Sequence, residues 1–237
     1  MPTIEVIPGV YQLMLAGVNM VLIAEEELTL IDTGVPGSLP GILNLLHRLG
    51  RSVEEITTVI ITHNHVDHIG GLPELKKHTA AKVYAHEAAL VDPPDDAPYP
   101  QGIRRLLRIP VLSPVRRRFV LGSGDIDVQL TGGEVLVPLG GLRVVHTPGH
   151  TPCSICLYSP LHRMLFVGDA MQRRRRKLQF PAKMVSIDLA MAVVSVGTLA
   201  QLDSEILVLG HGQPVRHGAR AWVQALERTG VDTDHGD

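Results

Sequence analysis

The residues best suited to chemistry lie between positions 62 and 71, in the stretch Thr-His-Asn-His-Val-Asp-His-Ile-Gly-Gly. Three histidines and one aspartate form the pattern His-x-His-x-Asp-His, at His63, His65, Asp67 and His68. Neutral imidazole and carboxylate groups are the ligands that divalent transition metals take in proteins. A random order would give this pattern about 0.002 times per chain of this composition. The spacing therefore predicts a metal site rather than a polar turn that is merely rich in histidine.

The elements on either side must hold this stretch in place. The β-branched run 59–61 predicts a buried strand before it, and residues 72–77 predict a short helix after it. In the second half of the chain a metal-type residue again follows a predicted strand at three positions, His150, Asp169 and His211. Loops at the ends of strands in one sheet lie along one edge, so we expect all seven side chains to converge.

The remaining apolar patterns predict a mixture of strands and helices. Further strands are predicted at 10–15, 19–24, 28–31, 82–85, 128–130, 134–137, 142–146, 154–158, 164–167 and 206–209. Helices are predicted at 41–49, at 187–202 with Ser186 as the N-cap, and at 219–228. Two irregular stretches, 91–118 and 171–185, are interpreted as surface excursions from a single domain that spans residues 1–237.

The composition limits the classes of function. The chain has 237 residues, of which 45% are hydrophobic, so it can bury a sizeable core. A net charge of −2 and an aromatic content of 3% do not indicate nucleic-acid binding, and no apolar run is long enough to span a membrane. Residues 1–5 lack the features of a signal peptide, and two cysteines make no disulfide framework. We therefore expect a reduced, cytoplasmic protein.

Five motifs together resemble those of the metallo-β-lactamase fold superfamily. They are Leu-Ile-Asp-Thr-Gly at 30–34, the histidine-rich stretch at 62–71, His-Thr-Pro-Gly-His-Thr at 146–151, Val-Gly-Asp at 167–169 and Leu-Gly-His-Gly at 209–212. They occur in the order and spacing of the family and are spread over most of the chain. The resemblance implies an α/β fold, a four-layer αββα sandwich in which two mixed β-sheets lie face to face with helices outside.

The resemblance also implies two metal sites. The implied ligands are His63, His65 and His150 for the first ion, Asp67, His68 and His211 for the second, and Asp169 as a bridge between them. Asp32 matches a family aspartate that lies beside the centre, where it would orient a ligand histidine. The implied cofactors are two divalent ions. Zinc is the default, but ligation by nitrogen and oxygen alone equally admits iron or manganese.

The implied activity is hydrolysis. Two bridged ions would lower the pKa of a shared water, so that a metal-bridging hydroxide attacks the carbonyl of an ester, lactone or thioester. The candidate catalytic residues are Asp67 and Asp169. The alternative is an oxidoreductase similar to the persulfide dioxygenases, which share much of this motif set but use a single iron ion.

Departures from the family patterns narrow the choice of branch within the superfamily. Zinc β-lactamases lack the bridging aspartate, so Asp169 favours the branch that resembles glyoxalase II and the acyl-homoserine-lactone lactonases. Ala170 follows Asp169 where the lactonases often carry a tyrosine. The short segment after His211 leaves little room for the glutathione-binding domain of glyoxalase II.

Two features near these motifs carry a weaker signal. His146 lies in the same turn as His150, and we predict that it belongs to the core or supports a ligand without touching metal. The Cys-x-x-Cys at 153–156 falls on a predicted strand, where residues three apart face opposite sides. These two cysteines are therefore predicted to be structural.

The arginine-rich segments bear on the substrate. Of the 22 Lys and Arg residues, 11 lie within the two irregular stretches at 104, 105, 108, 116–118 and 173–177. A charge run is usually a solvated surface, but this one begins close to Asp169. We therefore predict that Arg173, Arg174, Arg175 and Arg176 form part of a substrate rim that favours an anionic small molecule. The sequence does not fix the oligomeric state, and a homodimer is compatible with it.

Overall fold

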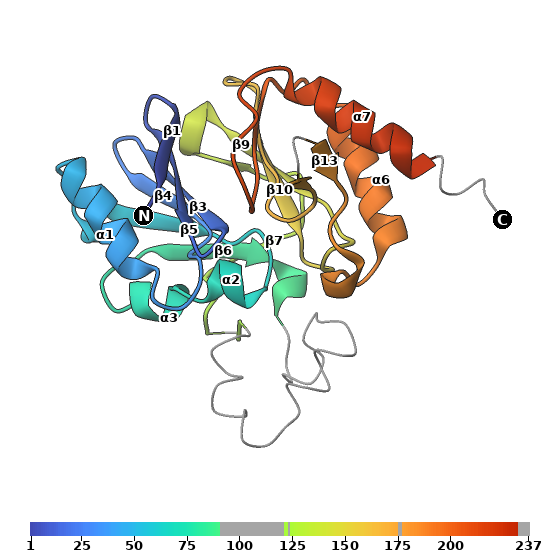
Figure 1. Cartoon of the computed structure of the whole chain (residues 1–237). Coiled ribbons are helices and arrows are strands. Elements are labelled where there is room, and N and C mark those ends of the chain that lie inside the picture. Colours follow the sequence, from blue (N-terminus) through green and yellow to red (C-terminus); the bar gives the residue numbers. More distant parts are fainter. Residues whose placement is uncertain (91–120, 123, 175–176, 232–237) are drawn as a thin grey trace.

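The computed structural model describes residues 1–90, 121–122, 124–174 and 177–231, so the predicted excursion at 91–118 lies outside the described residues. Two β-sheets pack face to face, and helices cover the outer side of each (Figure 1). This is the four-layer αββα arrangement predicted from the sequence, and that prediction is confirmed. None of the helices in the described part of the chain is long and apolar enough to cross a membrane.

The first sheet contains, among the described residues, seven strands in sequential order. They are β1 (Thr3–Ile7), β2 (Val10–Leu15), β3 (Val18–Ala24), β4 (Leu28–Ile31), β5 (Ile56–Ile60), β6 (Lys82–His86) and β7 (Val128–Leu130). Strands β1 to β4 pair antiparallel through short turns, whereas β4 to β7 pair in parallel, and β1 was not predicted. Three helices follow strands of the parallel half: α1 (Leu39–Arg48), α2 (Val66–Ile69) and α3 (Leu72–Leu75). The helix α2 was not predicted.

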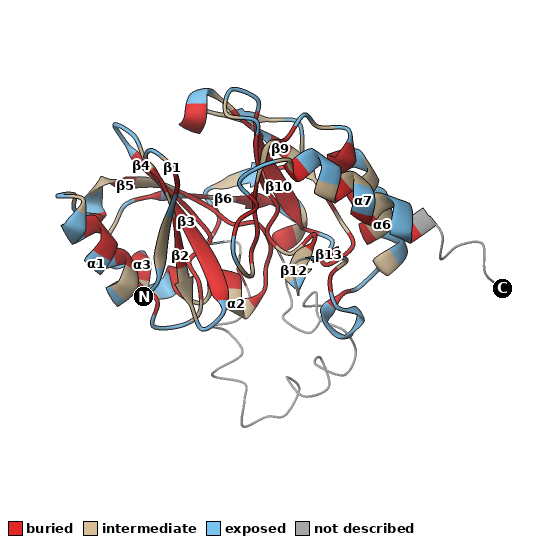
Figure 2. Cartoon of the chain, turned by 45° about the horizontal axis from the view of Figure 1, so that its top comes forward, coloured by how far each residue is buried: buried red, intermediate tan, exposed pale blue. Residues whose placement is uncertain are grey.

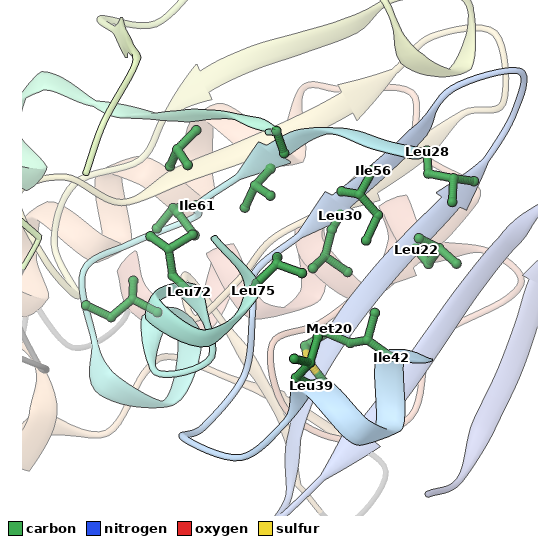
Figure 3. Close-up of a cluster of buried hydrophobic side chains, with 14 of the residues drawn as sticks. Met20, Leu22, Leu28, Leu30, Leu39, Ile42, Ile56, Ile61, Leu72 and Leu75 are labelled. Atoms are coloured by element: carbon green, nitrogen blue, oxygen red, sulfur yellow. The ribbon is translucent and has the colours of Figure 1, made fainter. Parts of the chain in front are cut away.

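Apolar contacts attach these helices to the outer face of the first sheet. Leu39 and Ile42 of α1 and Leu72 and Leu75 of α3 are buried in one cluster with strand residues such as Leu30 (Figure 3). Each buried leucine or isoleucine stabilises the fold by about 1.5–3 kcal/mol. The metal-type residues between β5 and α3 are therefore held at both ends by packed elements.

The second sheet has the strand order β14-β11-β10-β9-β8. Its strands are β8 (Val135–Leu136), β9 (Leu142–His146), β10 (Ile155–Ser159), β11 (Met164–Phe166) and β14 (Ile206–Val208). Among these described strands, β14 and β11 pair in parallel, and the other neighbouring strands pair antiparallel. Helices α6 (Leu189–Ala200) and α7 (Ala219–Val231) cover the outer face, and buried strand residues fill the space between the sheets (Figure 2).

Residues 171–185 differ from the prediction of an irregular excursion. They contain a short antiparallel hairpin of β12 (Gln172–Arg174) and β13 (Lys177–Gln179). The prediction failed because strands of three mostly polar residues are too short to show an apolar alternation. The helix predicted at 187–202 also begins later, at Leu189, because Asp188 rather than Ser186 caps it by accepting a hydrogen bond from the Met191 amide (2.9 Å).

The two cysteines are buried free thiols, as expected for a structural pair. Cys153 packs into the cluster beneath α1 and α3, whereas Cys156 packs into the cluster beneath α6 and α7. Burial raises the pKa of the Cys156 thiol to about 12. Neither sulfur belongs to a candidate metal-ligand group within the described residues.

Candidate metal centre

All seven predicted ligands converge at the edge where their strands end. They come from four loops, which follow β5, β9, β11 and β14. Their nitrogen and oxygen atoms form three overlapping groups that could hold metal ions: His63, His65 and His150; His63, His68 and Asp169; Asp67, His68 and His211. The first and third groups are the two ligand sets that the family resemblance implied.

The spacing of the ligand atoms fits small divalent ions. His65 Nδ1 lies 3.0 Å from His150 Nε2, and His68 Nε2 lies 3.3 Å from Asp169 Oδ1. His211 Nε2 lies 3.1 Å from Asp169 Oδ2. Ligands bonded at 2.0–2.2 Å to one tetrahedral ion are about 3.4 Å apart. The observed distances therefore match ligands that share an ion.

Asp169 stands between the two ligand sets. Its Oδ2 atom lies 3.6 Å from His150 Nε2 of the first set and 3.1 Å from His211 Nε2 of the second. Its Oδ1 atom faces His68. Gly210 makes room for this carboxylate, because a Cβ at that position would lie 2.2 Å from Asp169 Oδ1. One carboxylate can therefore serve both sets.

Three buried atoms at the centre have no hydrogen-bond partner: His63 Nε2, His68 Nε2 and Asp169 Oδ1. The last two are close in distance but not aligned for a hydrogen bond. Leaving such atoms unpaired in a protein interior costs about 1–3 kcal/mol each. These atoms belong to residues that could hold metal, and bound divalent ions would satisfy all three. The donor set therefore fits metal.

Three of the rings are anchored on their far side at Nδ1, so that Nε2 faces the centre. His68 Nδ1 lies 2.7 Å from the Asp32 carboxylate, and His211 Nδ1 donates to the Gly17 carbonyl at 2.9 Å. His150 Nδ1 lies 3.1 Å from Ser186 Oγ. With Nδ1 as the anchored nitrogen, the neutral form of each ring keeps the Nε2 lone pair for a ligand bond.

Asp32 does more than orient His68. Its carboxylate accepts hydrogen bonds from the Thr62 amide (2.8 Å) and the Thr62 hydroxyl (2.7 Å). Asp32 itself has a left-handed backbone with φ of 58°, a conformation that aspartate tolerates better than most residues. The buried carboxylate thus ties the end of β4 to the loop that carries the histidines. The contact with a ligand histidine is the one expected for Asp32.

The candidate ligands at the centre include both neutral and charged side chains. Burial lowers the pKa of His63 well below its usual value and that of His150 to about 3, so both imidazoles are neutral. Burial also opposes charge on His68, but Asp169 and Asp32 outweigh it and raise the His68 pKa well above its usual value. Burial raises the Asp169 pKa, but His68 and His211 lower it by more, so the carboxyl group is ionised.

Solvent reaches the centre from the second ligand set. The side chains of Asp67 and His211 are 32% and 34% exposed, whereas His63, His68 and His150 are buried. A small molecule can therefore approach Asp67 and His211 more directly than the first ligand set.

Two predicted site features lie apart from the ligands. His146 stacks on the ring of His86, with centroids 3.9 Å apart, and its Nε2 bonds to the Pro152 carbonyl at 2.8 Å. Arg173 donates to the Pro214 carbonyl at 3.2 Å and lies over the ring of Trp222.

The structure describes only one of the other three arginines of the predicted rim. Arg174 is exposed, and Arg175 and Arg176 lie outside the described residues. The hairpin lies beside the His211 loop, because a Cβ on Gly212 would lie 3.6 Å from the Arg173 carbonyl oxygen, within van der Waals contact.

Sequence reasoning missed Gly17 and Ser186, which anchor two of the rings. Both are far from their histidines in the chain, and neither has a local pattern that distinguishes it. Thr62 was quoted with the histidine motif, but its bonds to Asp32 were not foreseen.

The fold and the centre agree with comparisons to known proteins. The model of the Metallo-beta-lactamase superfamily matches residues 14–211. The chain is 32% identical over 232 residues to the probable metallo-hydrolase YflN of Bacillus subtilis (strain 168), covering 89% of this chain and 86% of that protein. The chain therefore belongs to the metallo-beta-lactamase superfamily, whose members include metallo-hydrolases.

Two further proteins are similar to the chain in sequence or in fold. It is 30% identical over 144 residues to a hydroxyacylglutathione hydrolase of Rhodopseudomonas palustris (strain BisB18), covering 59% of this chain and 44% of that protein. A crystal structure of a metallo-beta-lactamase family protein from Thermus thermophilus shares the fold. Its TM-score is 0.74 at 23% identity, over 96% of this chain and 81% of that one.

Proposed function

We propose that this protein is a dinuclear metal-dependent hydrolase that acts on the carbonyl of an ester, lactone or thioester. The observation that carries the proposal is the position of Asp169, whose two oxygens face both ligand sets. A site for one ion would need no carboxylate between two groups of three ligands. The match to a hydroxyacylglutathione hydrolase supports a thioester among the candidate substrates.

The roles of the residues follow from their places. The histidines His63, His65 and His150 would hold the first ion, and Asp67, His68 and His211 the second. Divalent ions bound there supply Lewis acidity, which lowers the pKa of a water ligand and polarises a carbonyl. The partly exposed Asp67 lies beside the path from solvent, where it can accept a hydrogen bond from a water or a substrate group.

Protein expressed with sufficient metal should contain close to two ions per chain. The reason is that seven nitrogen and oxygen ligands stand in two connected sets. Elemental analysis of the purified protein checks this, together with hydrolysis assays on ester, lactone, thioester, phosphodiester and β-lactam panels. Turnover of the first three classes supports the proposal, and turnover confined to the last two contradicts it.

A single-iron oxidoreductase is the second candidate. The group His63, His68 and Asp169 has the two-histidine, one-carboxylate composition found in non-haem iron oxygenases. Stoichiometric oxygen consumption with a thiol-derived substrate, by protein that holds one iron and no second ion, would favour this candidate over hydrolysis.

We also propose that the hairpin flanking His211 favours anionic substrates. If it does, kcat/KM for an anionic substrate should fall as salt is added, because exposed charges are screened over about 10 Å at 0.1 M. Glutamine in place of the arginines at 173–176 should raise KM severalfold and leave the metal content unchanged. Arg143→Gln is the control, since Arg143 is exposed at the opposite end of β9 from the ligand loop. Equal effects of both changes would contradict the proposal.

A further inference from the structure

Ser186 is a buried serine beside the centre that capping does not explain. It is 8% exposed and has extended backbone, with φ of −111° and ψ of 144°. Asp188 caps α6, so the Ser186 hydroxyl is not used at the helix start. Instead Ser186 Oγ lies 3.0 Å from the Ala182 carbonyl oxygen and 3.1 Å from His150 Nδ1.

These two contacts determine where the protons are. A carbonyl oxygen can only accept, so the single hydroxyl proton of Ser186 points to Ala182. The hydroxyl oxygen is then left as an acceptor for His150, whose Nδ1 must carry the proton. His150 Nε2 is therefore the nitrogen with the free lone pair, and it is the one that faces His65 and Asp169.

The backbone around Ser186 reinforces this arrangement. The Ile187 amide donates to the His150 carbonyl (3.1 Å), and the Asp188 amide donates to the Gly149 carbonyl (2.8 Å). Both bonds fix the loop, but neither acts on the imidazole ring. The ring itself is held on its outer side by the Ser186 hydroxyl.

We propose that Ser186 is a positioning residue, which fixes the tautomer and ring orientation of His150 so that Nε2 is presented to the first ion. This proposal rests on the proposed function, because it takes His150 to be a metal ligand. Partners that orient ligand histidines typically change metal affinity or activity by about 10- to 100-fold when they are removed. We expect a change of that size here.

Three variants separate this role from simple packing. Ser186→Ala removes the hydroxyl. Ser186→Thr keeps it on a side chain that suits extended backbone. Ser195→Ala is the matched control, because Ser195 is also buried and its hydroxyl donates to the Pro148 carbonyl (2.7 Å) of the same loop without touching a ligand.

Two measurements are needed. The first is the affinity for zinc alone, by competition with a chromophoric chelator. We expect a fall of about 10- to 100-fold in Ser186→Ala and values close to wild type in the other two variants. The second is the tautomer of His150 in the metal-free protein, by long-range ¹H–¹⁵N NMR. We expect the Nδ1-protonated form in wild type and a mixture of tautomers in Ser186→Ala.

Wild-type affinity and tautomer in Ser186→Ala would overturn the proposal. So would an equal loss of affinity in Ser195→Ala, or a Thr variant that behaves like the Ala variant. A wild-type protein that binds no zinc would instead contradict the proposed function. In that case the tautomer measured without metal still decides whether Ser186 orients His150.

Discussion

Replacing Asp169 with alanine should lower kcat/KM by roughly three orders of magnitude, because one carboxylate faces both ligand sets. Its oxygens lie 3.1–3.6 Å from nitrogens of His68, His150 and His211. A catalytic metal ion contributes several kcal/mol to transition-state stabilisation, and each 1.36 kcal/mol is tenfold in rate. The metal content should fall from about two ions per chain to one or fewer. Steady-state kinetics and elemental analysis of the same preparation check both expectations.

His146→Ala is the matched control for this prediction. His146 lies four residues from His150, but its contacts are with His86 and the Pro152 carbonyl. The variant should lose some stability with the ring stack, keep its metal, and lose less than about tenfold in activity, below the effect of a residue that orients a ligand. Comparable loss of metal and kcat from both variants would show that the ligand assignment in this turn is wrong.

Substitutions at Asp32 should affect stability and metal binding together. Three groups donate to its buried carboxylate, and alanine would leave all of them without an acceptor. Removing one partner of a buried charged pair costs about 3–5 kcal/mol. In a chain of this size that corresponds to a fall of about 6–20 °C in Tm. Thermal unfolding of the metal-free protein measures this without any contribution from bound ions.

Asp32→Asn separates the two effects. Asparagine keeps the shape and tolerates the left-handed backbone, but it can accept through only one oxygen. The free energy of unfolding should fall by about 1–3 kcal/mol, and zinc affinity by about 10- to 100-fold because His68 loses its partner. Asp127→Asn is the control, since Asp127 accepts from the Val83 amide (2.8 Å) away from the centre. The zinc affinity of the Asp127→Asn variant should stay at the wild-type value.

The sequence indicated which side chains converge on the centre, because each one is part of a short motif after a strand. Their partners were harder to predict. Gly17 binds His211 across 194 positions, and Ser186 binds His150 across 36. Such contacts depend on how the two sheets pack, and a single sequence carries no local signal for them. The same limit explains the error at α6, where Ser186 and Asp188 are both good caps and only the tertiary contact with His150 decides between them.

The hairpin of β12 and β13 shows a different limit. Its strands pair only with each other in the described structure, so they need no alternating apolar pattern. Arg173 helps to fix its position, through the Pro214 carbonyl and the ring of Trp222, and Leu178 packs into the cluster beneath α6 and α7. A cluster of arginines in sequence indicated charge, but not that one of them holds a strand in place.

The two buried thiols report separately on the opening of the two halves of the molecule. Cys153 is enclosed by the packing of the first sheet and Cys156 by that of the second, although only two residues lie between them. A thiol reagent can modify either sulfur only when its own surroundings open, because both are buried. Mass spectrometry of the peptide that carries both would therefore compare the opening rates of the two halves within one chain. Unequal labelling would mean that the halves open separately, and equal labelling that they open in a single step.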